Sequence, residues 1–202
     1  RNIAQGAYCM GLLKFYQGEY DTAERLFRRA LALASTFGEL RLRLNCENTL
    51  GEVARAAGQP AEAQERYRRM AGLAEATEQF VLGALGRLNL ALMATLAHDT
   101  PEALLQADRA ERNLKPNPRH WLWSVLALIR AVLSARRGDE SASRSWWAVA
   151  QEHGLEQLRA PDFRTLLLEF ATNAARHDWD DLTKKARALG ESAQPTTKSD
   201  VG

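Results

Sequence analysis

The chain has 202 residues, 46% of them hydrophobic and 26% charged, with 27 Lys and Arg against 25 Asp and Glu. This near balance of charge offers no electrostatic basis for binding nucleic acid or an anionic membrane. We find no pattern that predicts a signal peptide in these residues, and no apolar segment of roughly 18 residues, which a membrane span needs. Cys9 and Cys46 lack a metal-binding spacing and suggest a reducing compartment, so we expect a cytoplasmic location.

The composition predicts an all-α protein, because Ala and Leu dominate, β-branched residues are few and no period-two alternation occurs. Residues 3–17 have a helical pattern, Gly18 marks a turn, and a second amphipathic helix follows. Because the helical pattern is already established near Arg1, we expect the sequence to be part of a longer protein. One face of the second helix carries residues three or four apart: Tyr20, Ala23, Phe27, Ala30 and Ala34.

This pattern returns every 40 residues, without insertions. The small residue of the first helix recurs as Gly11, Gly51, Ala91, Ala131 and Ala171. The turn residue recurs as Gly18, Gly58, His98, Gly138 and Asp178. Two positions of the second helix recur as Ala23, Ala63, Ala103, Ser143 and Thr183, and as Phe27, Tyr67, Ala107, Trp147 and Arg187.

Helix-ending and helix-starting residues divide the chain at this period. Gly38 suits a left-handed helix end, Pro60 and Pro161 suit first helical positions, and Thr100 suits a cap before a proline. Residues 1–190 are therefore predicted to form five repeats, at about 1–38, 39–78, 79–117, 118–158 and 159–190. Residues 191–202 are polar and without pattern, so we expect a disordered tail or linker.

A Gly in the first helix, followed by Ala-x3-aromatic and a further Ala in the second, resembles the tetratricopeptide (TPR) helix-turn-helix. The resemblance implies a right-handed α-solenoid of about five TPR-like antiparallel helix pairs. Its period exceeds the roughly 34 residues usual for TPR units. Similar lengthened units occur in sensor or scaffold regions of bacterial multidomain signalling ATPases, maltose-regulator-like activators and Ser/Thr kinases.

The sequence contains no pattern that predicts catalysis, a cofactor or a metal. The glycines form no phosphate-binding loop, and no histidine has a second ligand at i+4: His98, His120, His153 and His177. We therefore predict a domain that is not an enzyme.

Two further features have a functional and a structural interpretation. The arginines in 25–29 and 66–69 could contact nucleic acid, but a solvated convex face is favoured because they occupy equivalent second helices beside Glu24 and Glu65. The tryptophans of the fourth repeat are most simply inter-helix packing. An exposed Trp121 or Trp123 would instead mark a partner surface.

The TPR resemblance implies that first helices line a concave groove, where we expect a protein or peptide partner. An asparagine amide can both donate to and accept from a peptide backbone. This favours binding over the alternative that Asn45 and Asn48 are merely exposed and Asn89 caps a buried contact. The predicted binding residues are Tyr8, Leu12, Phe15, Asn45, Asn48, Glu52, Arg55, Asn89 and Leu92. A chaperone-type carboxylate clamp is not expected, because Lys14 stands alone on the first helices.

Two alternatives remain open at this stage. A small-molecule sensor would hold a metabolite in the same groove, as the maltose-regulator resemblance implies. The partner could also be other domains of the full-length chain, or a second copy in a homo-oligomer. A closed apolar pocket would favour the metabolite, a long open groove the peptide, and a bare apolar end repeat the oligomer.

Overall fold

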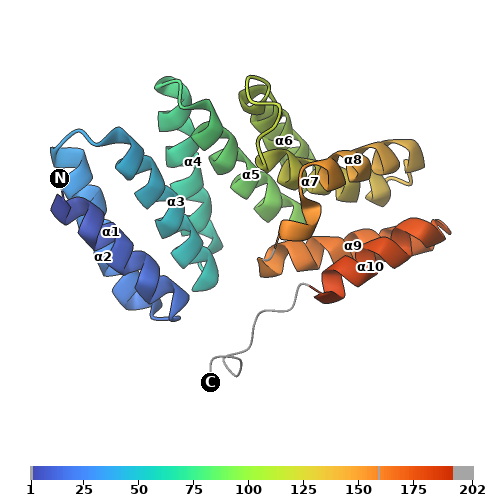
Figure 1. Ribbon diagram of the computed structural model, residues 1–202, viewed down its shortest axis with the longest axis horizontal. Coiled ribbons are helices and arrows are strands. Elements are labelled where there is room, and N and C mark those ends of the chain that lie inside the picture. The colour runs from blue at the N-terminus through green and yellow to red at the C-terminus, as the bar shows by residue number, and fades with distance from the viewer. Residues whose placement is uncertain (1, 159, 193–202) are drawn as a thin grey trace. The chain divides into compact units, whose positions relative to one another are not determined.

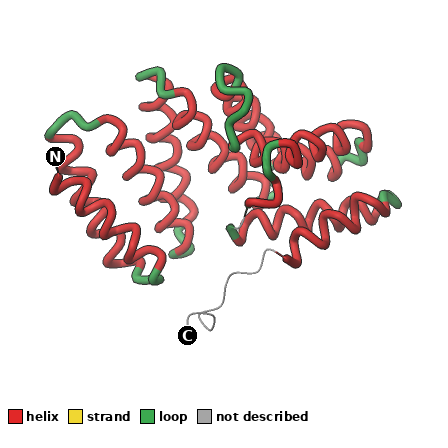
Figure 2. Tube along the Cα trace, viewed as in Figure 1, coloured by secondary structure: helices red, strands yellow, loops and turns green. Residues whose placement is uncertain are grey.

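The computed structural model describes residues 2–158 and 160–192, and all regular structure there is helical (Figures 1 and 2). The predicted all-α class and the consecutive antiparallel helix pairs are confirmed. The elements are α1 Asn2–Tyr16, α2 Tyr20–Thr36, α3 Leu40–Ala56, α4 Pro60–Ala76, α5 Phe80–Leu96, α6 Thr100–Leu114, α7 Leu122–Arg136, α8 Glu140–Glu152, the 3-10 helix η1 Leu155–Gln157, α9 Pro161–Arg176 and α10 Asp180–Ser192.

The chain divides into two compact units, Arg1–Leu90 and Ala91–Gly202, with the boundary inside α5. We call these the N-terminal and C-terminal units and describe each by itself. The expected tail at 191–202 falls mostly outside the described residues, because Glu191 and Ser192 end α10 and the description stops there.

The turns between paired helices follow the 40-residue period. The backbone is left-handed at every predicted turn position, with φ of +79° at Gly18, +59° at His98 and +61° at Asp178. Glycine adopts this conformation without a Cβ penalty, and Asp and His are among the non-glycine residues found there most often. The predicted cap Thr100 is instead the first residue of α6, and the Asp99 carboxylate accepts the capping bond from the Glu102 amide.

Close helix contacts explain why small residues recur. A Cβ built on Gly51 would lie 2.6 Å from the Tyr67 ring, and one on Gly11 would lie 2.6 Å from the Phe27 ring. In the third repeat an alanine stands at each of the two positions, and Ala91 and Ala107 are both buried. The aromatic ring therefore occurs in these two repeats where the facing residue lacks a side chain.

The predicted burial of the second-helix alanines is confirmed, since Ala23, Ala63 and Ala103 are all 0% exposed. The predicted packing role also holds for Trp147, whose ring stacks on Phe170 at a centroid distance of 4.9 Å. By contrast, Trp121 is 52% exposed. The fifth repeat departs from the pattern, because Arg187 replaces the aromatic residue and is exposed.

The arginine-rich faces of α2 and α4 are only partly solvated. Arg28 and Arg69 are exposed, and they pair with Glu24 and Glu65 one helical turn earlier. The prediction was wrong for Arg66, which is only 8% exposed and reaches Glu47 on α3 at 3.2 Å. Its long side chain crosses from α4 to α3, which the spacing of arginines along one helix does not reveal.

The two ends of the described chain differ in surface chemistry. On α3, Leu50 and Val53 pack with Ala23 and Phe27 of α2. The equivalent positions on α1 are Met10 and Leu13, and they are 48% and 51% exposed.

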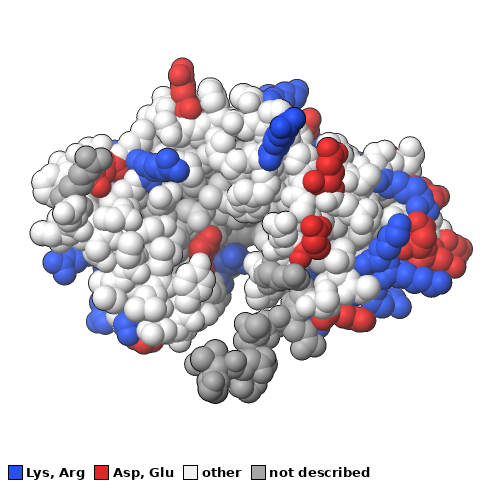
Figure 3. Space-filling model, viewed as in Figure 1, with Lys and Arg blue, Asp and Glu red and all other residues white. Residues whose placement is uncertain are grey.

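Charged side chains of both signs instead gather over α8 and α10 (Figure 3). There Arg144 bridges Glu140 and Asp181 at 2.8 and 2.9 Å. The uncovered apolar residues of α1 are therefore unusual, because the end repeats of such arrays normally have polar outer faces.

Candidate functional site

The most distinctive polar feature of the N-terminal unit is one face of α3. Residues three or four apart on a helix share a face, and on α3 this face is polar: Arg41, Asn45, Asn48, Glu52 and Arg55. We call these five residues the α3 polar stripe. Four of them are half-buried, and Arg41 is exposed.

A chain of hydrogen bonds crosses this stripe. Asn89 of α5 donates from Nδ2 to Oδ1 of Asn48 at 2.9 Å. Asn48 in turn donates from Nδ2 to Oε1 of Glu52, also at 2.9 Å. The three predicted residues are thus brought together, and the interpretation of Asn45 and Asn48 as merely exposed does not hold, because both are half-buried.

These bonds use only part of the hydrogen-bonding capacity of the Asn48 and Asn89 side chains. An amide side chain has two N–H donors and an oxygen with two lone pairs. Counting only bonds among residues 2–158 and 160–192, Asn48 retains one donor and one lone pair, and Asn89 retains one donor and its oxygen. The pair is fixed in orientation by the protein and can still bond a ligand that carries both donors and acceptors, as a peptide backbone does.

Burial dominates the electrostatics around Glu52. Desolvation raises the pKa of the Glu52 carboxyl above its usual value, and the Asn48 hydrogen bond and the Arg55 charge oppose this rise. Burial likewise raises the pKa of Tyr8 to about 12, with smaller contributions from Cys46 and Glu52. Tyr67 also reaches about 12, mainly through burial. The Glu52 charge thus acts on two tyrosines, Tyr8 and Tyr67, whose raised pKa keeps them neutral at physiological pH.

The predicted apolar residues of α1 pack inside the N-terminal unit. Tyr8, Leu12 and Phe15 are half-buried and contact the cluster that contains Phe27 and Leu50. The Tyr8 and Phe27 ring centroids are 5.6 Å apart. Only part of each of these side chains is accessible to a partner.

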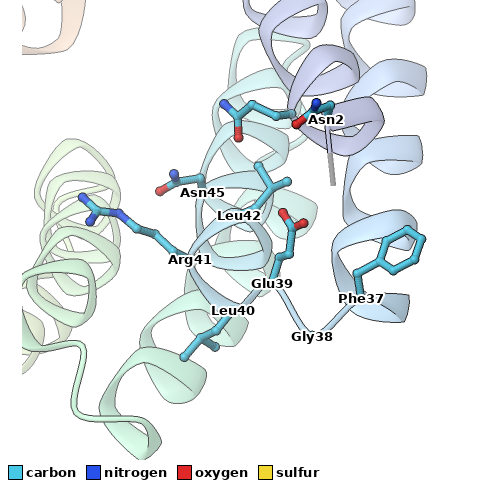
Figure 4. Close-up of a pocket in the computed structure, with 9 residues that line it drawn as sticks. Asn2, Phe37, Gly38, Glu39, Leu40, Arg41, Leu42 and Asn45 are labelled. Carbon is cyan, nitrogen blue, oxygen red and sulfur yellow. The ribbon is translucent and has the colours of Figure 1, made fainter.

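A cavity of about 910 Å³ opens at the end of the stripe. It is lined by Asn2 and Gln5 of α1, the α2–α3 connection with Leu40, and Arg41, Leu42 and Asn45 of α3 (Figure 4). Figure 4 shows Arg41 and Asn45 projecting from the same side of α3, whereas Phe37 projects the opposite way.

The cavity's contributors were only partly anticipated from the sequence. Asn45 was among the predicted residues, but Asn2, Gln5, Glu39 and Arg41 were not. Arg41 could have been found, because it lies four residues before Asn45. The remaining predicted residue, Leu92, is 4% exposed and belongs to the C-terminal unit.

Comparison with known proteins agrees with this architecture. Residues 2–76 match the tetratricopeptide repeat family. The described residues form a helical repeat region, and its first four helices are similar to tetratricopeptide repeats. No relative among the curated proteins matches this repeat region.

Two solved structures resemble the repeat region in fold. BtubC (BKLC) from P. vanneervenii has a TM-score of 0.70 at 12% identity, covering 98% of this chain and 85% of that protein. A putative kinesin light chain from Podospora anserina, with nearly identical TPR-like repeats, has a TM-score of 0.63 at 16% identity, covering 95% and 97%. At these identities the likeness concerns the fold alone.

Residues 2–158 and 160–192 contain no group of three His, Cys, Asp or Glu side chains placed to hold a metal ion. Over the same ranges, no helix combines the length and apolar character required to cross a membrane.

Proposed function

We propose that this repeat region is a non-catalytic protein- or peptide-binding module that acts as sensor or scaffold of a bacterial cytoplasmic signalling or regulatory protein. Tetratricopeptide repeats generally mediate protein–protein interaction or scaffolding, and residues 2–76 match that family. The proposed binding surface is the α3 polar stripe with Asn89, flanked by Tyr8, Leu12 and Phe15. Leu92 is left out of this surface, because it is 4% exposed and belongs to the C-terminal unit.

The observation that carries this proposal is the Asn89–Asn48–Glu52 hydrogen-bonded chain. Two amides are held in place by the protein, and each retains donor and acceptor capacity. An extended peptide presents alternating N–H and C=O groups, which match a pair of amides that offers both donors and acceptors. The aromatic and aliphatic side chains on α1 supply an apolar border for the partner's side chains.

The alternative ligand is a metabolite in the 910 Å³ cavity, whose volume lies within the range of about 300–1,000 Å³ typical of small-molecule sites. Such sites are mostly apolar. This cavity is lined by Phe37, Leu40 and Leu42, and also by three carboxamides and two charged groups: Asn2, Gln5, Asn45, Glu39 and Arg41. Its polar border and its place at the end of the stripe favour a peptide.

The exposed face of α1 favours a second candidate partner, another copy of this chain or a further domain of its full-length protein. In α3 the corresponding face is covered by α2, whereas Met10 and Leu13 remain uncovered. Sedimentation of wild type against Met10→Asp and Leu13→Asp variants tests self-association. A wild type that stays monomeric would rule out the homo-oligomer.

The main proposal is tested by selecting binders from a random peptide library on the whole chain and titrating a selected peptide calorimetrically. Asn48→Ala should weaken binding by about 1–3 kcal/mol, because backbone groups of the peptide lose a partner. Two exposed positions serve as controls: Arg25→Ala on α2, and Asn117→Ala, which removes the same amide elsewhere. Equal affinity of wild type and Asn48→Ala for every selected peptide would overturn the proposal.

A further inference from the structure

The regular repeat is interrupted at two places in the C-terminal unit. The connections α2–α3 and α4–α5 span only residues 37–39 and 77–79, whereas α6–α7 spans 115–121 and α8–α9 spans 153–160. Residues of both long connections line a common cavity of about 290 Å³. The 40-residue period is kept, so these longer connections take the place of the last helical turns of α6 and α8. Loops that depart from the regular pattern often form the binding face of a repeat protein.

The cavity has an aromatic wall. Trp121, at the end of the α6–α7 connection, lines it together with His153, Gln157 and Phe163. Trp121 is 52% exposed, although indole rings in a folded protein usually cover much of their apolar surface. A neighbouring hollow of about 430 Å³ shares Trp121, His153 and Gln157 with this cavity. The two hollows therefore adjoin, and Trp121 lines both of them.

The rim of the site carries an excess of negative charge. Glu152 and Glu156 line the outer hollow, against the single guanidinium of Arg119. Within residues 2–158 and 160–192, neither carboxylate takes part in an ion pair, whereas Glu140 and Glu169 in the same unit pair with Arg144 and Arg136.

Elsewhere in the C-terminal unit, an indole ring and carboxylates already hold one of the protein's own arginines. The guanidinium of Arg130 lies 5.1 Å from the centroid of the Trp146 ring. Its Nη2 atom also contacts Asp108 at 2.6 Å and Glu111 at 2.7 Å. An indole face and two carboxylates together hold one arginine there.

We propose that the cavity beside Trp121 binds an arginine side chain of a protein partner. The indole would stack on the guanidinium, and Glu152 and Glu156 would accept its hydrogen bonds. A planar guanidinium suits this combination better than an ammonium group, because it can stack and bond two carboxylates at once. A purely apolar side chain would fit less well, since it would desolvate the carboxylates without pairing them.

This site is separate from the proposed groove of the N-terminal unit, and the two can be tested independently. The probe is the peptide acetyl-Gly-Gly-Arg-Gly-Gly-amide, titrated into the whole chain while the indole N–H resonances are followed by NMR. Trp121→Phe assigns the Trp121 signal. The matched probe replaces arginine with citrulline, which keeps the shape of the side chain and removes its charge.

We expect saturable shifts of the Trp121 signal with the arginine peptide, and about tenfold weaker binding of the citrulline peptide. The Glu152→Gln/Glu156→Gln variant should bind the arginine peptide about tenfold more weakly than wild type does. Trp121→Leu should abolish binding of this peptide. Asp180→Asn removes an exposed carboxylate elsewhere in the unit and should leave the affinity unchanged.

Folding is checked by circular dichroism, which Trp121→Leu should hardly affect because the ring is half exposed. Equal affinities for the arginine and citrulline peptides would overturn the proposal. The absence of any saturable shift in wild type would overturn it as well. Asn48→Ala, which tests the groove, should leave arginine-peptide binding unchanged.

Discussion

Gly51→Ala tests directly whether the packing of paired helices depends on a missing side chain. In a helix, replacing Gly by Ala normally stabilises by about 0.5–1 kcal/mol. At Gly51 the new Cβ would lie 2.6 Å from Tyr67 Cε1, and Tyr67 is only 1% exposed. The ring cannot move aside freely, so overpacking should cost about 1–3 kcal/mol. We expect a net destabilisation of about 1 kcal/mol.

Gly72→Ala is the matched control, because Gly72 lies inside α4 with nothing within 4 Å of its Cβ position. This change should stabilise by about 0.5–1 kcal/mol, since only helix propensity changes. A second control is the double variant Gly51→Ala/Tyr67→Ala, which reproduces the Ala91 and Ala107 pair of the third repeat. In the Tyr67→Ala background, Gly51→Ala should become stabilising, because the ring that it meets is gone.

The measurement is urea unfolding followed by circular dichroism, with melting temperature as a second readout. For a chain of this size, 1 kcal/mol corresponds to about 2–4 °C in melting temperature. The melting temperature should therefore fall in Gly51→Ala and rise in Gly72→Ala. If Gly51→Ala stabilised as much as Gly72→Ala, the close contact with Tyr67 would not constrain the sequence, and this reasoning would be refuted.

Three further outcomes are expected in the same unfolding assay. Ala63→Leu should destabilise by about 1–3 kcal/mol, because Ala63 is 0% exposed, and an unchanged melting temperature would contradict the repeat alignment. Arg66→Ala should cost about 3 kcal/mol by leaving the partly buried Glu47 unpaired, whereas Arg69→Ala should cost about 0.5 kcal/mol or less. Burial raises the pKa of Tyr67 from 10.0 to about 12, so its stabilising contribution is present below pH 10 and lost between pH 10 and 12. A pH titration of unfolding free energy should show this loss, about 3 kcal/mol, in wild type and a smaller one in Tyr67→Phe.

The sequence by itself determined the helical class and the repeat, because both depend on local, periodic signals. A left-handed turn requires Gly or a tolerant residue, and it recurs at Gly18, Gly58 and Gly138. Alanines with a 40-residue step mark the closest helix contacts. Such signals require no knowledge of which distant residues meet.

The candidate site was only partly within reach of the sequence. The spacing of Asn45, Asn48 and Glu52 predicted that they share one face of a helix. The structure confirms that all three belong to one continuous helix, α3. The hydrogen bond from Asn89 to Asn48 joins residues 41 positions apart. Its existence depends on how α5 packs against α3, which the pattern within either helix does not specify.

Tertiary structure alone decided which of the long arginine side chains and of the tryptophans are buried. Arg66 and Arg69 stand on one helix with similar neighbours, yet only Arg66 reaches across to Glu47 and is buried. Trp147 is enclosed by Phe170, whereas Trp121 lies in a long connection and stays half exposed. The physical reason is the same in each case: burial depends on atoms supplied by other helices. The position of those helices is set by packing over the whole unit rather than by the local sequence.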